Sequence, residues 1–351
     1  MPGHEPLLEL NANDLRDRLQ DLGEPAYRSQ QILSWVYQSR AADFSAMTNL
    51  PGALRQRLEQ IFTLCTAQQM ARSESPDGTI KLLLAWPGGH TTETVMIPAH
   101  GASTRRTACL STQVGCDVGC RFCASGIGGS ARNLTVGEVV EQALAISDLL
   151  QSRDERLSHI VFMGMGEPLA NYDVTIEAIR RLNAAWGLGI AQRRITLSTV
   201  GLPKQIERLA SEGLQITLAL SLHAPNDKLR RQLIPWAENI PLQRLLDACR
   251  VYRHTTGREV TLEYCLLAGI NDLENHAAEL AAIAQRLRAH VNLLMYNPVE
   301  GLPYSRPGRN RTIEFLKRLR AQGVRANLRE SRGLETDAAC GQLRHQISSS
   351  Q

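Results

Sequence analysis

The sequence has no apolar run long enough to cross a membrane, no segment of signal-peptide type and little net charge. A membrane-spanning helix needs roughly 20 consecutive apolar residues, so we expect no transmembrane segment. The first residues carry acidic side chains and no apolar stretch, and we therefore expect a cytoplasmic protein. A formal net charge of +4 over 351 residues is too small to identify a nucleic-acid partner.

The sequence does contain enough apolar material for a large core, together with an unusual supply of cysteine. Hydrophobic residues make up 43% of the chain and charged residues 21%, which excludes a disordered or collagen-like protein. A length of 351 residues is typical of two domains. Eight cysteines in a reducing compartment indicate metal binding or thiol chemistry rather than structural disulfides.

The spacing of apolar residues divides the chain into three parts. Residues 1–66 repeat apolar positions at helical spacing and predict a small helical domain. Residues 67–105 contain two strand-like runs separated by Pro87-Gly88-Gly89, which predicts a β-hairpin in a linker region. Residues 106–351 alternate strand-like and helix-like stretches, which predicts an α/β domain with a parallel sheet.

The strand-like runs of the α/β domain are too few for a closed eight-stranded barrel. They are Thr107–Val114, His159–Met165, Ile195–Val200, Ile216–Leu222, Val260–Leu267, Val291–Tyr296 and Arg325–Leu328. In an open sheet and in a partial barrel alike, functional residues lie where the parallel strands end. The segments that follow these runs are therefore where we expect the chemistry.

The strongest local signal is three cysteines, Cys116, Cys120 and Cys123, directly after the first of these strands. Three thiolates this close on one loop favour a soft metal centre. A four-iron cluster held by three cysteines keeps one iron open for a substrate. A structural zinc site is the alternative, and it needs a fourth ligand such as the distant His223.

Polar or acidic residues also stand at the ends of several later strands. Glu167 lies in a glycine-containing loop after the second strand, where its carboxylate suits an ammonium group. The comparable residues after the third, fourth and sixth strands are Ser198, Ser221, His223 and Asn297. An ordinary turn or a helix cap is the alternative reading at each of these positions.

Two cysteines outside the triplet have unusual settings. Cys109 lies in the first strand, and Cys340 lies near the C-terminus among small and polar residues. A thiol on such a terminal segment suits a nucleophile that reaches the barrel mouth. Cys65, Cys249 and Cys265 fit small hydrophobic core residues instead.

The cysteine triplet after the first strand of an α/β domain resembles the radical S-adenosylmethionine (radical SAM) superfamily. The resemblance implies a reduced 4Fe–4S cluster that passes an electron to bound S-adenosylmethionine, which then gives a 5′-deoxyadenosyl radical. The implied fold is a partial (β/α)6 barrel, which agrees with the alternation above. In this chain the barrel carries a small N-terminal helical domain and a β-hairpin extension.

All the motifs together resemble the RlmN/Cfr family of radical SAM RNA adenine methyltransferases, and most of all its dual-specificity RlmN branch. They extend over nearly the whole chain. The matching segments are Tyr27–Ile32, Met47–Leu50, Cys109 with the cysteine triplet, Arg132–Thr135, Gly164–Pro168, Leu197–Thr199, Leu220–Asp227 and Asp337–Leu343.

The resemblance implies a role for each matching residue. Cys340 is methylated by one S-adenosylmethionine, and a radical from a second one removes hydrogen from that methyl group. The methylene radical adds to an adenine carbon, and Cys109 resolves the protein–RNA adduct, leaving a disulfide with Cys340. Glu93 matches the general base. The implied S-adenosylmethionine contacts are Gly166, Glu167, Ser198, Ser221, Leu222, His223 and Asn297, and the implied cluster ligands are Cys116, Cys120 and Cys123.

Two adenine carbons are candidates for methylation within this family. The intact Glu167-Pro168 and Leu220–Asp227 segments favour C2 of an adenosine in 23S ribosomal RNA over C8. The transfer-RNA adenosine beside the anticodon is a second candidate substrate, and a non-catalytic zinc-bound RNA module is the remaining alternative. The implied electron donor is a protein such as flavodoxin, and we expect a monomer.

Contacts to RNA are expected from the N-terminal helical domain and from arginine side chains. Arginines could bind phosphates or form an ordinary solvated surface. The candidates are Arg105, Arg106, Arg193, Arg194, Arg230, Arg231, Arg306, Arg309 and Arg311.

Overall fold

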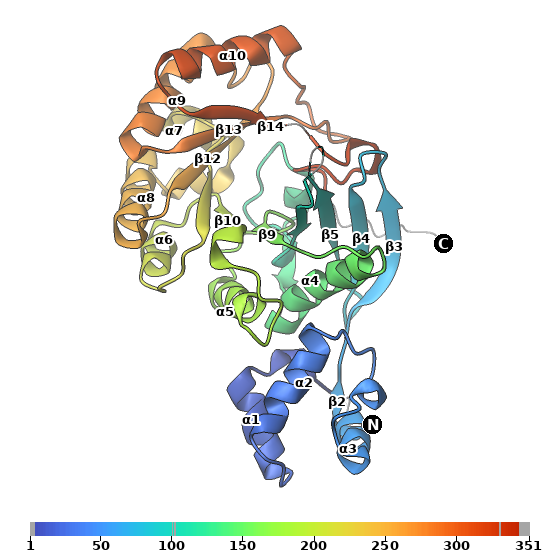
Figure 1. Cartoon of the computed structure of the whole chain (residues 1–351). Helices are drawn as coiled ribbons and strands as arrows, with labels where there is room; N and C mark the ends of the chain where they lie inside the picture. The colour runs from blue at the N-terminus through green and yellow to red at the C-terminus, as the bar shows by residue number, and fades with distance from the viewer. Residues whose placement is uncertain (1–3, 100, 102, 330, 344–351) are drawn as a thin grey trace.

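A computed structural model describes residues 4–99, 101, 103–329 and 331–343. Three N-terminal helices lie apart from a curved sheet that is covered by the later helices (Figure 1). These N-terminal helices are α1 (Ala12–Asp21), α2 (Tyr27–Tyr37) and α3 (Gly52–Ile61), beside a short parallel pair formed by β1 (Glu5–Pro6) and β2 (Phe62–Thr63). Within the described segments, no helix has the length and apolarity needed to cross a lipid bilayer.

The large sheet has ten strands and is open, because its two end strands do not pair with each other. In spatial order its strands are β14 (Ala326–Arg329), β13 (His290–Met295), β12 (Val260–Leu266), β11 (Thr217–Ser221), β10 (Ile195–Thr199), β9 (His159–Phe162), β6 (Arg106–Cys109), β5 (Thr91–Pro98), β4 (Ile80–Ala85) and β3 (Gln68–Glu74). Neighbours from β6 to β14 pair in parallel, whereas β3, β4, β5 and β6 pair antiparallel. The predicted α/β fold with a partial barrel is confirmed.

Helices follow the parallel strands and line the outer side of the sheet (Figure 1). They are α4 (Val136–Gln151), α5 (Tyr172–Asn183), α6 (Pro203–Ala210), α7 (Asp227–Leu233), α8 (Leu242–Thr256), α9 (Glu274–Leu287) and α10 (Arg309–Ala321). Short 3-10 helices are η1 (Leu7–Glu9), η2 (Phe44–Ala46), η3 (Ala124–Gly126), η4 (Gln192–Arg194), η5 (Pro235–Asn239) and η6 (Leu334–Thr336).

Alternation along the parallel strands separates the core from the barrel interior. In β10, Ile195 and Leu197 are fully buried, while Thr196 and Ser198 on the opposite face are partly accessible. Side chains two residues apart share a face of a strand. The apolar face therefore packs on the helices, and Ser198 points to the side on which a ligand can bind.

The first predicted strand, Thr107–Val114, is wrong as a single element. The chain leaves the large sheet after β6, and β7 (Gln113–Gly115) pairs instead with β8 (Ser130–Asn133). Gly115 permits this turn because its φ is +82°, and a Cβ there would lie 2.1 Å from the carbonyl oxygen of Gly129. The change of direction carries the three cysteines across the end of the sheet.

The hairpin predicted for residues 67–105 is also incomplete. The turn between β4 and β5 is where it was expected, but β3 adds a third strand, and β5 pairs with β6 of the parallel sheet. Most of β3 is exposed, so its residues lack the alternation of apolar and polar residues that marks a half-buried strand. This antiparallel extension is continuous with the barrel.

A buried carboxylate joins the N-terminal helices to the α/β domain. Glu141 of α4, 2% exposed, accepts hydrogen bonds from the amides of Thr66 (2.8 Å) and Ala67 (2.6 Å) and from the Thr66 hydroxyl (2.8 Å). Burial raises the pKa of Glu141, and these hydrogen bonds oppose the rise. The segment that leaves the helical domain is thereby fixed to α4.

Replacing Glu141 with alanine should lower the free energy of unfolding by about 3 kcal/mol, because buried donors would lose a charged acceptor. The Glu141→Gln variant keeps one acceptor oxygen and should lose less. Urea unfolding followed by circular dichroism measures both. The exposed Glu59 of α3 provides the control, since Glu59→Ala should change the free energy by no more than about 0.5 kcal/mol. Equal stabilities for the Glu141 and Glu59 variants would contradict this assignment.

Candidate active site at the mouth of the barrel

The three clustered cysteines lie on a loop, residues 116–123, that packs against the end of α7. The Cys116 amide donates to Gly129 O (3.2 Å), and the Cys123 amide donates to Cys120 O (3.1 Å). The Arg121 amide donates to Leu233 O of α7 (3.0 Å). The cysteine loop is therefore held at its start, at its turn and against the neighbouring helix.

The three cysteines of this loop are free and half-buried. Burial raises the pKa of each thiol, that of Cys116 to about 12, and neighbouring thiolates raise the pKa of Cys116 and Cys120 further. A bound cation offsets this cost, because a coordinated thiol loses its proton outright. The donor set consists of soft sulfur atoms and suits iron or zinc.

The number and type of these donors distinguish the candidate groups. Iron–sulfur clusters are held by Cys thiolates, and this loop supplies three of them. A structural zinc site is closed by four ligands, and the loop itself offers no fourth Cys or His. The residues present therefore fit a 4Fe–4S cluster.

The loop after β9 brings a carboxylate and two glycines to the same end of the sheet. Glu167 is 2% exposed, and its two carboxylate oxygens accept from the amides of Leu169 and Val200, each at 2.9 Å. Burial raises its pKa, although these hydrogen bonds lower it. Gly166 has a φ of +99°, and a Cβ there would lie 2.7 Å from Gln113. The close approach of the two loops therefore requires glycine.

The next strand ends contribute two hydroxyls and an imidazole. Ser198 Oγ of β10 and Ser221 Oγ of β11 lie 3.0 Å apart. The Leu222 amide donates to Glu263 O (3.0 Å), and Leu222 is fully buried. His223 Nδ1 accepts from the Cys265 amide at 3.0 Å, which leaves the proton of the neutral ring on Nε2. Burial lowers the pKa of His223 to about 3.

The C-terminal segment, residues 337–343, is fastened over the cysteine loop. The amide of Ala124 donates to Gly341 O (2.8 Å), and Ser125 Oγ donates to Leu343 O (2.6 Å). Both donors directly follow the last cysteine of the loop. On the other side, Asn297 Nδ2 donates to Cys340 O (3.1 Å). Cys340, far from the loop in sequence, is thus placed beside it.

Cys340 and Cys109 lie close enough for their charges to interact. Burial raises the pKa of Cys109, and the charge of Cys340 raises it further. Cys340 is an exposed residue, but burial of its thiol raises the pKa of that thiol. Val95, Met165 and Ala338 share an apolar cluster with Cys109. Both thiols are free, so the disulfide that the family resemblance implies is not present in this structure.

Glu93 lies on β5 beside the C-terminal segment and forms a buried ion pair. Lys81 Nζ of β4 is 2.7 Å from Glu93 Oε1, and the same ammonium donates to Asp337 O (3.2 Å). Glu93 is 6% exposed and lies two residues before Val95, on the face of the strand that turns towards Cys109. One lysine therefore connects Glu93 to the segment that carries Cys340.

Sequence reasoning missed several residues of this site. Lys81 gave no signal, because a strand lysine is common on any surface, and the sequence assigned no contact to Ser125, although it stands where a threonine is usual in the family. Arg230 was expected to contact RNA, and that expectation is wrong, since it is 1% exposed. Arg106 pairs with Glu155, and Arg306 donates to Tyr296 O (2.8 Å) and Asn297 Oδ1 (2.8 Å). These guanidiniums are engaged within the chain.

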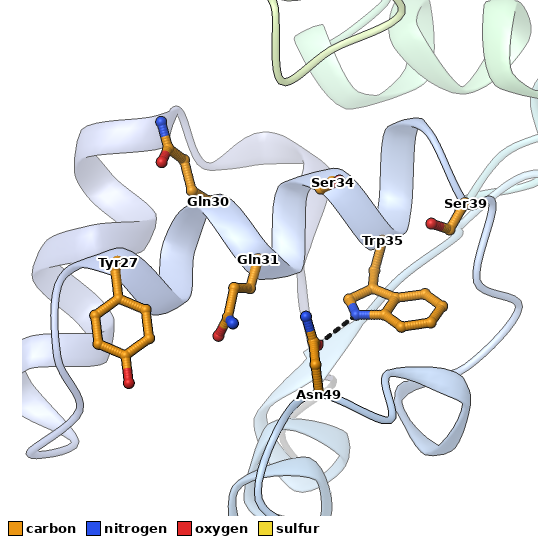
Figure 2. Close-up of a pocket in the computed structure, with 7 residues that line it drawn as sticks. All are labelled: Tyr27, Gln30, Gln31, Ser34, Trp35, Ser39 and Asn49. Carbon is orange, nitrogen blue, oxygen red and sulfur yellow. Dashed lines mark hydrogen bonds between the residues drawn. The ribbon is translucent and has the colours of Figure 1, made fainter.

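A separate pocket of about 490 Å³ lies among the N-terminal helices (Figure 2). Its lining residues are Tyr27, Gln30, Gln31, Ser34, Trp35, Ser39 and Asn49. Trp35 Nε1 donates to Asn49 Oδ1 (2.6 Å), and Tyr27 is 55% exposed. The pocket therefore offers aromatic surface and amide groups, and it contains none of the cysteines.

The depressed pKa of His223 makes stability depend on pH. His223 binds a proton near its ordinary pKa of 6.5 in the unfolded chain, but only near 3 in the folded chain. Its contribution to the free energy of unfolding is therefore complete above pH 6.5 and is lost as the pH falls towards 3. When the pH is lowered from about 7.5 to about 5.5, the free energy of unfolding of the native protein should fall by about 1.4 kcal/mol more than that of the His223→Asn variant. Urea unfolding at both pH values measures the difference. Equal losses in the two proteins would exclude a neutral buried His223.

Comparisons with protein-family models find two domains. Residues 6–64 match the ribosomal RNA large subunit methyltransferase N-terminal domain, and residues 110–281 match the radical SAM superfamily. The two matches fall on the N-terminal helices and on most of the parallel sheet.

Relatives along the whole chain agree with these matches. A probable dual-specificity RNA methyltransferase RlmN from Gloeobacter violaceus is 49% identical over 339 residues, 97% of this chain and 95% of its own. One from Thermosynechococcus vestitus is 47% identical over 338 residues, 96% of this chain and 98% of its own. The crystal structure of a radical SAM methyltransferase from Sphaerobacter thermophilus, 44% identical, matches 97% of this chain and 100% of its own with a TM-score of 0.94. The chain therefore belongs to the RlmN family within the radical SAM superfamily.

Proposed function

We propose that this chain methylates C2 of an adenosine in 23S ribosomal RNA, and also the transfer-RNA adenosine beside the anticodon. The observation that carries the proposal is the fastening of the Cys340 segment to Ala124 and Ser125, directly after the cysteine triplet. A methyl group on that thiol would lie beside a radical source. The dual-specificity names of the relatives support the two substrates.

Two sets of residues bind the cofactors. Cys116, Cys120 and Cys123 bind one 4Fe–4S cluster. The residues that contact S-adenosylmethionine, two of which are used per turnover, are Gly166, Glu167, Ser198, Ser221, Leu222, His223 and Asn297. When bound, the cluster and S-adenosylmethionine supply a radical able to abstract a hydrogen atom from a methyl group.

Cys340 carries the methyl group from its donor to the base. Adenine C2 has no lone pair to offer a methyl donor, so direct polar transfer is blocked and a thiol carrier avoids the requirement. Cys340 lies on an exposed segment, which is attached by hydrogen bonds that can be exchanged. Such a segment suits a group that meets two partners in turn.

Cys109 and Glu93 release the product. Glu93, paired with Lys81, takes the proton from adenine C2 as the adduct radical loses the one electron that the cluster supplied. The Cys109 thiol then loses its proton, and its sulfur bonds to the Cys340 sulfur. The bond between Cys340 and the new carbon breaks with its electron pair on carbon, and that carbon takes up a proton to become the methyl group, leaving a Cys109–Cys340 disulfide. The charge of Cys340 acts on Cys109, and Ala338 of the Cys340 segment packs in the apolar cluster of Cys109, which supports a disulfide between the two thiols.

The N-terminal helices help to bind RNA in this proposal. The pocket of Figure 2 offers the rings of Tyr27 and Trp35, and unpaired bases stack on such rings. Exposed arginines supply phosphate contacts. They are Arg105, Arg193, Arg194, Arg231 and Arg309. A one-electron donor such as flavodoxin reduces the cluster, and the protein acts as a monomer in the cytoplasm, where its RNA substrates are.

Anaerobic turnover with ribosomal RNA tests the proposal. The native protein with a reconstituted cluster should form 2-methyladenosine, identified by mass spectrometry after nuclease digestion. The Cys340→Ala variant should keep its cluster and form none, because no other residue can carry the methyl group. The Cys65→Ser variant controls for loss of a thiol outside the site. Formation of 8-methyladenosine would support the other regiochemistry, and product from Cys340→Ala would exclude the carrier role.

Replacing Cys109 with alanine should trap the chain on its RNA. Without the resolving thiol, the bond between Cys340 and the base persists, and a nuclease-sensitive band of higher mass should appear on a denaturing gel. The Cys109→Ala/Cys340→Ala double variant is the matched control and should show no such band. Normal turnover by Cys109→Ala would show that another group releases the product.

A further inference from the structure

One buried cation in the described chain lacks a counter-charge. Arg230 of α7 is 1% exposed, and its Nη2 donates to Val200 O. Its Nε and Nη1 have no hydrogen-bond partner. Among the described residues, Arg230 also takes part in no ion pair at contact distance.

An unpaired buried guanidinium is costly to a fold. Moving a charge out of water costs several kcal/mol unless a partner repays it. Asp227, the acid on the same helix, accepts a hydrogen bond from the Leu242 amide at Oδ1 (2.7 Å) and forms no ion pair with Arg230 at contact distance, although its charge favours the charged guanidinium. The fold therefore retains a charged side chain whose remaining donors, Nε and Nη1, point to no group of the protein.

The position of Arg230 beside the cysteine loop identifies the group that would compensate its charge. Its helix packs on the cysteine loop through the Arg121 amide and Leu233 O, and Leu229 and Leu233 share an apolar cluster with Val118 and Phe122 of that loop. The three cysteines pack against the same cluster. Burial lowers the pKa of Arg230 to about 10, and Cys120 is the strongest influence in the opposite direction. The guanidinium thus stays charged at neutral pH beside the triplet.

We propose that Arg230 is the fixed counter-charge of the iron–sulfur cluster and sets its reduction potential. The inference rests on the cluster of the proposed function. A 4Fe–4S cluster on three thiolates is an anion, and reduction adds a further negative charge. A nearby cation therefore stabilises the reduced form more than the oxidised form and raises the potential.

The hydrogen bond to Val200 fixes the distance between this charge and the rest of the site. Val200 O accepts from Arg230, while the Val200 amide donates to Glu167. The guanidinium and the carboxylate are consequently held by the same residue at the end of β10.

Potentiometric titration of the holoenzyme, followed by electron paramagnetic resonance without S-adenosylmethionine, tests the proposal. Arg230→Gln removes the charge but keeps a donor for Val200 O, whereas Arg230→Lys keeps the charge. The matched control is Arg231→Gln, the exposed neighbour on the same helix. Iron content and circular dichroism report cluster loading and folding for each variant.

Arg230→Gln should shift the one-electron reduction equilibrium at least tenfold towards the oxidised cluster, equivalent to about 59 mV. Arg230→Lys should shift it less, and Arg231→Gln should leave it unchanged. A loaded Arg230→Gln cluster with an unchanged potential would overturn the proposal, as would failure of Arg230→Gln to fold, since Arg230 would then be a structural residue. An unchanged potential with weakened S-adenosylmethionine binding would assign the guanidinium to that ligand instead. Absence of a cluster from the native protein would overturn the proposed function itself.

Discussion

Two hydrogen bonds from the residues that follow the cysteine triplet determine where the C-terminal thiol lies. Ala124 and Ser125 donate to the carbonyls of Gly341 and Leu343, and these contacts join the two most distant parts of the site. Each such bond contributes about 1 kcal/mol net. The segment is therefore positioned accurately, yet exchanging its contacts costs little. A carrier residue needs both properties, and a strand or a helix would provide only the first.

Burial dominates the electrostatics of the site. It raises the pKa of Cys109, of Cys340 and of all three thiols of the cysteine loop, so none of them ionises readily on its own. Charges of the chain that act on these sulfurs include those of Glu167, Asp117, Glu263, Arg329 and Arg230. Ionisation of these thiols consequently depends on the groups that bind at the site. This suits a reaction that must not begin before its cofactors are bound.

The sequence predicted the parallel sheet and the strand ends well, because buried parallel strands and cysteine spacing leave strong local patterns. It did not predict β3, whose exposed residues show no alternation, or the departure of β7 from the sheet, which depends on a contact between Gly115 and Gly129. It also placed Arg230 on the surface, since a pair of arginines in a helix reads as solvated. Contacts between distant segments, such as Lys81 with Glu93 and Asp337, leave no signal in either segment alone.

The antiparallel extension formed by β3, β4 and β5 is part of the candidate active site. Strands β4 and β5 place Lys81 and Glu93 at the site. Strand β5 pairs directly with β6, the strand of Cys109. Residues 67–105, which the sequence presents as a linker between two domains, therefore form one side of the candidate active site. Under the proposed function, loop exchange or chain shortening between residues 67 and 105 would alter the reaction itself, whereas the same changes before residue 66 would alter RNA binding.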